Sequence, residues 1–421
     1  MSFKSLTAYC RTLRLAVLVS SIPLACHAEG QPLKKTDLFI GGEKGFALYR
    51  IPGMVVTPKG SVLTYCEARS EANSDWGEIQ VLLRRSVDSG RTWGPAHQIA
   101  HFGERIPGPP RKTAGGENEQ TVHNPVAIVD HQTGAIHFLY CVNYARCFYM
   151  KSNDDGVTFT KPVEITQAFE SFRKVYDWNA IATGPGHGLQ LKNGRLVVPV
   201  WLAYGKVGAH DPSASGTIYS DDHGLTWHAG EIPLRNTPDS KNPNETAVAE
   251  LSDGRVMLNA RSSSLANRRL VTISSDGAAE WSTPSFDSAL PDPQCMGSLL
   301  RIPAPLPRGC LLFCNPDSLK LDEQGHEVPG AWAPRKNLAI RISKDDGQTW
   351  ASPKTIEDGS SAYSDLAQLP DGTVLCFYER ICDVKIGAKS ERKKMLSIAR
   401  LPLDWLLKPD PARALGSNWQ R

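Results

Sequence analysis

One short motif, Ser-x-Asp-x-Gly-x-Thr followed by Trp or Phe, returns at nearly regular intervals along the chain. Four complete copies and one degenerate copy (the fourth in order) begin at Ser86, Ser152, Ser220, Ser274 and Ser343. Their starts are separated by 66, 68, 54 and 69 residues. Repetition on this scale indicates an array of similar supersecondary units and argues against a division into unrelated domains.

The residue types of the motif predict a tight turn between two β-strands. Ser and Asp side chains bond to turn amides, Gly adopts a positive φ, and Thr returns to an extended strand. Copies follow short alternating or apolar runs such as residues 79–85 and 338–342, and helix signatures are nearly absent. The sequence therefore predicts an all-β fold, a six-bladed β-propeller with about 65 residues per blade. Because a single active site needs only one copy, we expect the recurring turn aspartates to be structural.

The N-terminal segment predicts a secretory signal peptide. Three basic residues precede a short apolar stretch, Leu15–Leu24, and small residues ending at Ala28 offer a cleavage site. We therefore expect residues 1–28 to be removed and residues 29–421 to form the propeller. The protein would then be secreted or periplasmic.

Stable membrane insertion is not expected. The apolar stretch, at about ten residues, is too short to span a bilayer, and no later segment is long enough. Lipidation would require Cys26 as the first residue of the mature chain, but Pro23 stands where such signals usually carry Leu. The sequence therefore disfavours a lipoprotein anchor.

Removal of the signal peptide leaves a chain without net charge. The full chain has 47 Lys and Arg against 44 Asp and Glu, and residues 1–28 contain three basic and no acidic residues. The remainder is balanced at 44 of each sign, which lacks the basic excess of a nucleic-acid-binding protein. An acidic ligand would have to be bound by a local site.

Eight cysteines remain after the signal peptide. The closely spaced pairs Cys141/Cys147, Cys310/Cys314 and Cys376/Cys382 are candidates for disulfides in an exported protein, although spacing alone cannot fix the pairing. No CxxC pair accompanies them, and the eleven histidines show no HxxH or HExxH spacing. We therefore expect neither a metal nor another cofactor.

Function is expected in residues outside the repeat. The segments that stand apart are Tyr49-Arg50-Ile51-Pro52, Glu67-Ala68-Arg69, Asp75, Asn244-Glu245, Arg261, Asn337 to Arg341, Ala362-Tyr363-Ser364-Asp365 and Phe377-Tyr378-Glu379-Arg380. Arg69 follows Arg50 by 19 residues, and Asp75 follows Arg69 by six. In this order, and together with the repeat, the segments resemble the exo-α-sialidases (neuraminidases) of glycoside hydrolase family 33 and of animals. The resemblance extends over essentially all of residues 29–421.

The resemblance implies a role for each residue. Arg50, Arg261 and Arg341 would hold the carboxylate of sialic acid. Asp75 would be the acid/base, Tyr363 the nucleophile and Glu245 its base. Glu379 would steady Arg50, and Arg69 would contact substituents of the sugar ring. Glu250 and Glu357 compete with Glu245 and Glu379 respectively, and motif position favours the latter two.

Elementary chemistry accounts for this set. Guanidinium groups stay charged and offer planar, bidentate donors to a carboxylate. A neutral phenol can approach an anionic substrate that would repel an Asp or Glu nucleophile, provided that a base removes its proton. We expect Asp75 to need a raised pKa or a partly dry loop to act as an acid.

Three functions are compatible with these residues. The first is hydrolysis of terminal sialic acids from glycoproteins, glycolipids or oligosaccharides, with retention of configuration. The second is a related enzyme on the same scaffold, a trans-sialidase or a sialidase for deaminated sialic acid. The third is a sialoglycan-binding propeller without catalysis, which would not need Asp75, Tyr363 and Glu245 together.

Overall fold

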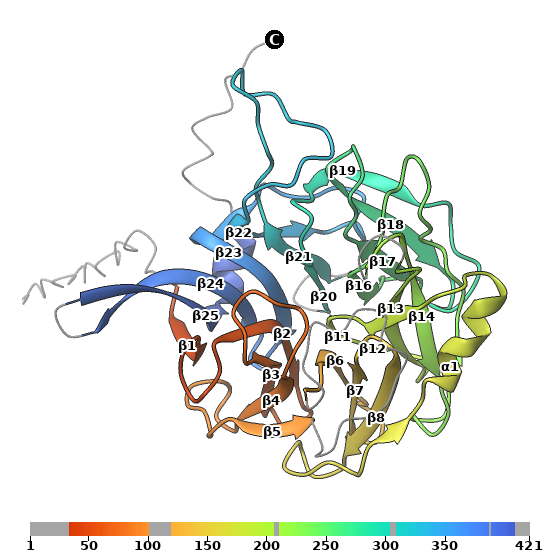
Figure 1. The fold of residues 1–421 in the computed structure, drawn as a ribbon, viewed down its shortest axis with the longest axis horizontal. Helices are drawn as coiled ribbons and strands as arrows, with labels where there is room; N and C mark the ends of the chain where they lie inside the picture. The colour runs from red at the N-terminus through yellow and green to blue at the C-terminus, as the bar shows by residue number, and fades with distance from the viewer. Residues whose placement is uncertain (1–32, 101–118, 206–209, 304–308, 387–388, 409–421) are drawn as a thin grey trace, which may run out of the picture. The chain divides into compact units, whose positions relative to one another are not determined.

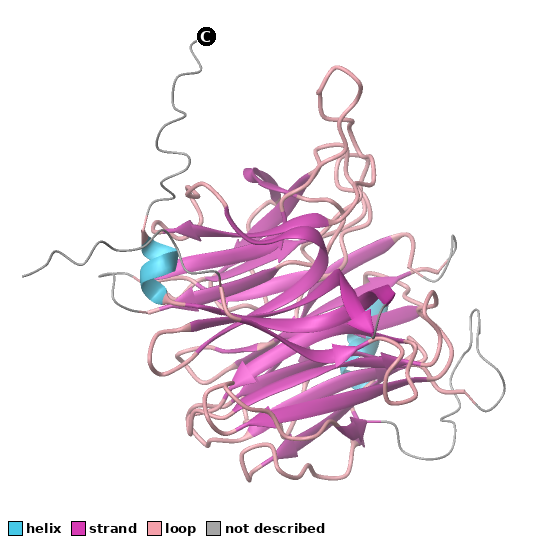
Figure 2. Cartoon of the chain, turned by 90° about the vertical axis from the view of Figure 1, so that its left-hand side faces the viewer, coloured by secondary structure: helices cyan, strands magenta, loops and turns pink. Residues whose placement is uncertain are grey.

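Strands make up nearly all of the regular secondary structure (Figure 2). The computed structural model describes residues 33–100, 119–205, 210–303, 309–386 and 389–408. Among these residues, the helices are α1 (Gln167–Glu170), the 3-10 helix η1 (Ser171–Lys174) and α2 (Leu403–Leu407). The predicted signal peptide lies outside the described residues. Within these ranges, no helix has the length and apolar character needed to cross a membrane.

The strands form five hydrogen-bonded sheets that follow one another around a common centre, the arrangement of a β-propeller (Figure 1). The first sheet contains β2 (Leu48–Val56), β3 (Val62–Arg69), β4 (Ile79–Ser86) and β5 (His97–Ala100). The second contains β6 (Val122–Val129), β7 (Ile136–Val142), β8 (Arg146–Ser152), β9 (Val163–Glu164) and β11 (Gly186–His187), of which β11 is parallel to β6. The predicted all-β class is therefore confirmed.

The next two sheets continue the same pattern. The third contains β10 (Ala180–Thr183), β12 (Leu189–Gln190), β13 (Leu196–Ala203), β14 (Ser213–Ser220) and β15 (His228–Ala229). The fourth contains β16 (Thr246–Glu250), β17 (Val256–Ala260), β18 (Arg268–Ser274) and β19 (Ser285–Pro291). Neighbouring strands in these two sheets are antiparallel, so successive strand ends alternate between two faces.

The fifth sheet has seven strands and joins the first and the last described strand. Its strands, from one edge to the other, are β1 (Lys35–Ile40), β25 (Lys389–Leu401), β24 (Val374–Ile386), β23 (Lys354–Gln368), β22 (Lys336–Ser343), β21 (Cys310–Pro316) and β20 (Ser298–Ile302). Strand β23 pairs with β22 as far as Ser360 and with β24 from Ser361 onward. The N-terminal strand β1 pairs antiparallel with β25.

The recurring motif forms turns that follow the strands β4, β8, β14, β18 and β22. In the copy after β14, Asp222 accepts hydrogen bonds from Ser220 Oγ (2.8 Å), Thr226 N (2.9 Å) and Thr226 Oγ1 (2.5 Å). The amide of Gly224, whose φ is +79°, donates to Ser220 Oγ at 2.9 Å. The side chains thus satisfy the turn's own backbone, which is a structural role.

An Asp222→Ala variant is expected to lose about 1–2 kcal/mol of unfolding free energy, because three hydrogen bonds that close one turn are removed. Asp222→Asn keeps an acceptor oxygen and should lose less. Urea unfolding of both variants measures the difference. Equal stability of Asp222→Ala and the unaltered protein would contradict the structural role.

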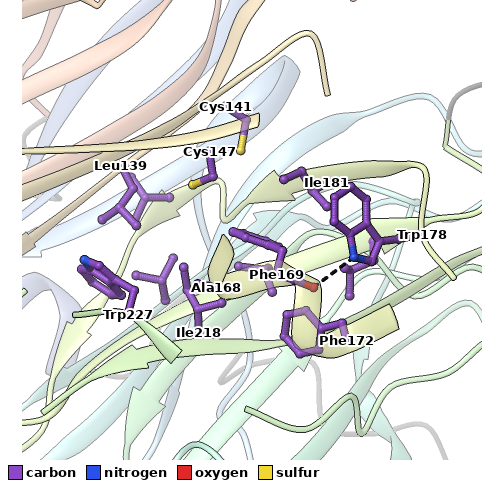
Figure 3. Close-up of a cluster of buried hydrophobic side chains, with 14 of the residues drawn as sticks. Leu139, Cys141, Cys147, Ala168, Phe169, Phe172, Trp178, Ile181, Ile218 and Trp227 are labelled. Atoms are coloured by element: carbon purple, nitrogen blue, oxygen red, sulfur yellow. Dashed lines mark hydrogen bonds between the residues drawn. The ribbon is translucent and has the colours of Figure 1, made fainter. Parts of the chain in front are cut away.

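The hydrophobic core lies between neighbouring sheets. Figure 3 shows the largest cluster, in which side chains of the second and third sheets pack around α1 and η1. Phe169 and Phe172 are buried there, and the indole Nε1 of Trp178 donates to the carbonyl of Phe169 at 3.0 Å. This packing anchors the long connection between β9 and β10.

The candidate disulfides are absent, because all eight described cysteines are free thiols. Cys310 and Cys314 lie four residues apart on β21, and Cys376 and Cys382 lie six apart on β24. Extended strands separate such residues by roughly 13 Å or more, which no disulfide can bridge. Cys141 does face Cys147 across β7 and β8, and the two remain unbonded.

Candidate active site

A cavity of about 310 Å³ brings together most of the predicted site residues. Its lining includes Arg50, Arg69, Asp75, Glu245, Arg261 and Tyr363. They converge because they lie at equivalent strand ends. Arg69 ends the second strand of its sheet, whereas Glu245 immediately precedes β16 and Arg261 immediately follows β17. The motif turns follow the third strand of a sheet and therefore lie at the opposite face.

Tyr363, Glu245 and Arg261 form one hydrogen-bonded unit. The Tyr363 hydroxyl donates to Glu245 Oε1 at 2.5 Å, while Arg261 Nη1 donates to Glu245 Oε2 at 2.5 Å and to the Tyr363 oxygen at 2.8 Å. Burial and the charge of Glu245 raise the pKa of Tyr363. Burial opposes ionisation of Glu245, but Arg261 and the Tyr363 hydroxyl outweigh it and lower its pKa. The unit is a neutral phenol held by an ionised base.

Arg50 is fixed by Glu379, as expected. Arg50 Nε donates to Glu379 Oε1 at 3.1 Å, and the Arg50 guanidinium carbon lies 4.9 Å from the centroid of the Tyr363 ring. The same Glu379 oxygen accepts the amide of Ile51 at 3.1 Å. Ile51 has a φ of +59°, a strained conformation for a β-branched residue. Glu379 therefore orients both the cation and the backbone that carries it.

The prediction for Arg341 was wrong, because this residue lies away from the cavity. Arg341 is buried within β22, opposite Phe313 of β21, and its Nη2 donates to Asp317 at 2.8 Å. Arg335, just before β22, lines the cavity in its place. Its guanidinium carbon lies 5.3 Å from the Tyr363 ring centroid. Arg335 and Arg341 are six residues apart along an extended chain.

Arg335 differs from the other arginines of the cavity in lacking a counter-ion. Arg50 pairs with Glu379 and Arg261 with Glu245, whereas no carboxylate among the described residues pairs with Arg335. Its Nη2 donates to the carbonyl of Gln294 at 2.5 Å, and its buried Nε has no partner there. A desolvated guanidinium with a free donor is a ready site for an anion.

Asp75 contacts two arginines. Its Oδ1 lies 2.6 Å from Arg69 Nη1 and 3.7 Å from Arg50 Nη1, and 47% of its side chain is exposed. Burial acts to raise the pKa of Asp75, but Arg69 and Arg50 outweigh this and hold it at about 2. Of the two conditions expected for an acid, a raised pKa is not found, because the arginines stabilise the carboxylate.

Glu67 is a positioning residue that sequence reasoning missed. Only 1% of Glu67 is exposed, and its carboxylate accepts two hydrogen bonds from Arg69 (2.9 and 2.6 Å) and one from the amide of Asn124 (2.8 Å). Burial raises its pKa despite these donors. Glu67 and Arg69 are two apart on β3 and so share a face, which is the sequence signal for this pair.

A second buried ion pair supports the opposite side of the cavity. Asp292 lies 3.6 Å from Arg269 and accepts the amides of Ser262 (2.9 Å) and Cys295 (3.2 Å). Arg269 donates to the carbonyl of Cys295 at 2.8 Å. The pair thereby ties the residue after Arg261 to the segment whose Gln294 carbonyl holds Arg335.

The two competing carboxylates lie elsewhere. Glu250, at the far end of β16 from Glu245, accepts the amide of Lys192. Glu357 binds Lys35 and Tyr378. Neither lines the cavity, whereas Glu245 lines it and Glu379 binds Arg50, which lines it.

Part of the remaining wall of the cavity is aromatic. This aromatic wall consists of Tyr144, Trp201 and His210, and Trp76 packs on Tyr144 with ring centroids 4.8 Å apart. The Nε1 of Trp201 and the Nε2 of His210 have no hydrogen-bond partner among the described residues. No group of three or more His, Cys, Asp or Glu within the described ranges is placed to hold a metal ion.

Comparison with known proteins identifies the family. The profile of the BNR repeat-like domain matches residues 64–376. A sialidase of Micromonospora viridifaciens is 32% identical over 83% of this chain, which spans 53% of that relative's length. Sialidase-3 of Mus musculus is 27% identical, with 86% of this chain and 92% of the relative covered. The solved Hadza microbial sialidase Hz136 is 26% identical, with a TM-score of 0.70 over 89% of this chain and 69% of that one. The chain therefore belongs to the BNR-repeat family and, within it, to the sialidases.

Proposed function

We propose that the protein is a retaining exo-α-sialidase that releases terminal sialic acids from glycoproteins, glycolipids or oligosaccharides. The observation that carries the proposal is the neutral Tyr363, bound to the ionised Glu245 beside three arginines. This combination suits an anomeric carbon that bears a carboxylate.

The substrate carboxylate binds Arg50, Arg261 and Arg335. Glu379 and Glu245 already compensate the first two arginines, so Arg335 gains most from an incoming anion. Arg341, paired with Asp317, takes no part. Uncharged substituents of the sugar face the aromatic wall, where Trp201 Nε1 offers a free donor.

The reaction then proceeds by double displacement. The Tyr363 oxygen bonds to the anomeric carbon as its proton passes to Glu245, while Asp75 protonates the departing glycosidic oxygen. Water, deprotonated by Asp75, then displaces Tyr363, which recovers its proton from Glu245. Two inversions give net retention.

The low pKa of Asp75 is compatible with an acid role once substrate is bound. The substrate carboxylate engages Arg50, one of the two cations that stabilise the Asp75 anion, and adds a negative charge nearby. Both effects raise the pKa of Asp75 in the complex. The substrate itself would therefore prepare its acid catalyst.

Release of a fluorogenic aryl α-sialoside by the purified protein tests the proposal, with hexose and hexosamine glycosides as controls. Proton NMR of the first product should detect the α anomer. Hydrolysis of the controls alone, or first release of the β anomer, would refute the proposed activity or its stereochemistry. Transfer to added lactose distinguishes a trans-sialidase.

Asp75→Asn is expected to reduce kcat/KM for sialyl-lactose by about 10²-fold but to spare an activated aryl sialoside. A leaving group of low pKa departs without a proton, so it does not need the acid. Parallel kinetics on the two substrates measure the contrast. Equal losses on both would assign Asp75 another role.

The propeller itself is proposed to have six blades and to occupy residues 29–421. The change of partner along β23 divides the seven-stranded sheet into two blades of four strands, each of which includes one part of β23. Together with the four other sheets they make six blades. The recurring motif resembles the Asp box of the sialidase superfamily, and its turns would lie in five of the six blades. Export with cleavage after Ala28 belongs to the same proposal, and N-terminal sequencing of the secreted or periplasmic protein tests it.

A further inference from the structure

A second cavity, of about 580 Å³, adjoins the first at Asp75. The two cavities share Arg50, Arg69, Asp75 and Arg335. Asp75 protonates the departing oxygen in the proposed reaction, so the leaving group must extend from the reaction cavity past Asp75. The second cavity is where that group would lie.

One wall of the second cavity comes from a strand pair that extends beyond its sheet. Strand β23 pairs with β24 only as far as Arg380, and β1 pairs with β25 only from Met395 onward. Between these points, residues 381–386 pair with residues 389–394 as a hairpin arm, which projects from the left of the molecule in Figure 1. Ile381 and Lys394, at the base of this arm, line the second cavity.

Strand alternation turns Lys394 toward the active site. Lys394 is directly opposite Ile381, and Leu396 is opposite Glu379, so all four share one face of the hairpin. Glu379 binds Arg50 from that face. Lys393 belongs to the other face.

Lys394 is the unneutralised cation of this cavity. Arg50, Arg69 and Arg380 each pair with a carboxylate, and Arg335 is taken by the substrate carboxylate in the proposed mechanism. No ion pair joins Lys394 to any described residue, and its side chain is exposed. The ammonium group is therefore available to a ligand.

Trp332 supplies an apolar surface to the same cavity. It is 59% exposed, unusual for an indole, and lies three residues before Arg335. An exposed aromatic face and an unpaired cation in one cavity fit a sugar ring that carries an anionic group.

We propose that the second cavity is a subsite for an anionic leaving group, with Lys394 as its specificity-determining residue. The inference rests on the proposed sialidase function and names its preferred substrates. These are sialosides whose leaving sugar carries a carboxylate or a sulfate, such as the inner residue of a disialyl unit or a sulfated hexosamine.

The test compares Lys394→Met with Lys393→Met on substrates matched in all but the leaving group. Disialyl-lactose is set against sialyl-lactose, and sulfated against unsulfated sialyl-lactosamine. Lys394→Met is expected to lower kcat/KM roughly fivefold for the anionic member of at least one pair, at low ionic strength, and to change the neutral members less than twofold. The pair that responds identifies carboxylate or sulfate as the ligand. Lys393→Met, whose ammonium lies 3.9 Å from Glu391 on the opposite face, should change neither.

Two outcomes overturn the inference. Equal changes in kcat/KM for anionic and neutral leaving groups, or equal effects of the two lysine variants, would show that Lys394 does not recognise the charge of the leaving group. An aryl sialoside assay distinguishes failure of the proposed subsite from failure of the proposed function. Activity on it without discrimination refutes only the subsite, whereas no activity on any sialoside refutes the proposed function and the subsite together.

Discussion

A Tyr363→Phe variant is expected to retain its fold and to lose roughly 10⁴-fold in kcat/KM on an aryl sialoside. The substitution removes one oxygen, and the ring keeps its contacts with Ile51, Cys295 and Met296. Without the phenol oxygen, no bond to the anomeric carbon can form, and Glu245 is left with Arg261 alone. Steady-state kinetics and thermal unfolding of the variant measure the two effects.

A covalent adduct provides the control. A 3-fluoro sialosyl fluoride slows both displacements, while its good leaving group keeps formation of the adduct faster than its breakdown. The adduct should therefore accumulate on the peptide that contains Ala362-Tyr363-Ser364, and Tyr363→Phe should not be labelled. A label on Glu245 would instead make that carboxylate the nucleophile.

Arg335→Ala is expected to cost about 4 kcal/mol in transition-state binding, roughly a thousandfold in kcat/KM. Arg335 holds no carboxylate of its own, so its charge is free for the substrate. Arg341→Ala should alter kcat/KM less than about threefold, because Arg341 binds Asp317 away from the cavity, although it should lower the unfolding temperature. Kinetics on one aryl sialoside and calorimetry compare the pair.

The comparison separates the two arginines cleanly. A large loss of kcat/KM in Arg341→Ala, together with a nearly unchanged kcat/KM in Arg335→Ala, would show that Arg341 binds the substrate carboxylate, as predicted from the sequence. Arg335→Lys adds a further control, because it keeps the charge but removes the planar fork of donors. We expect it to recover only part of the lost affinity.

The candidate site was predictable where short motifs carry it. Arg50, Asp75, Glu245, Arg261 and Tyr363 were named from the sequence and line one cavity. Arg341 was predicted from its place just before the last copy of the motif, whereas Arg335 lies before the start of β22. Which of them faces the cavity depends on the path of the chain before β22, and on Asp317 as a competing partner.

The fold, too, was predictable where it depends on local sequence and not where it depends on pairing between distant segments. The repeated motif marked turns because their hydrogen bonds are local. The sharing of β23 between two partners at Ser360 and Ser361 depends on pairing between distant segments, to which a local pattern is blind. The low pKa of Asp75 was missed because it depends on where the segment after β3 places the carboxylate, in contact with Arg69 and close to Arg50.

The pairing of β1 with β25 has a consequence for how the molecule is made. Thr36 lies opposite Ile398, so β1 cannot complete its pairing until β25 has been synthesised. Until then the nascent chain exposes open strand edges, which readily pair with other chains. Truncation before β25, or loss of β1, would leave such an edge permanently. The first and the last described strand are thus both coupled to the solubility of the protein.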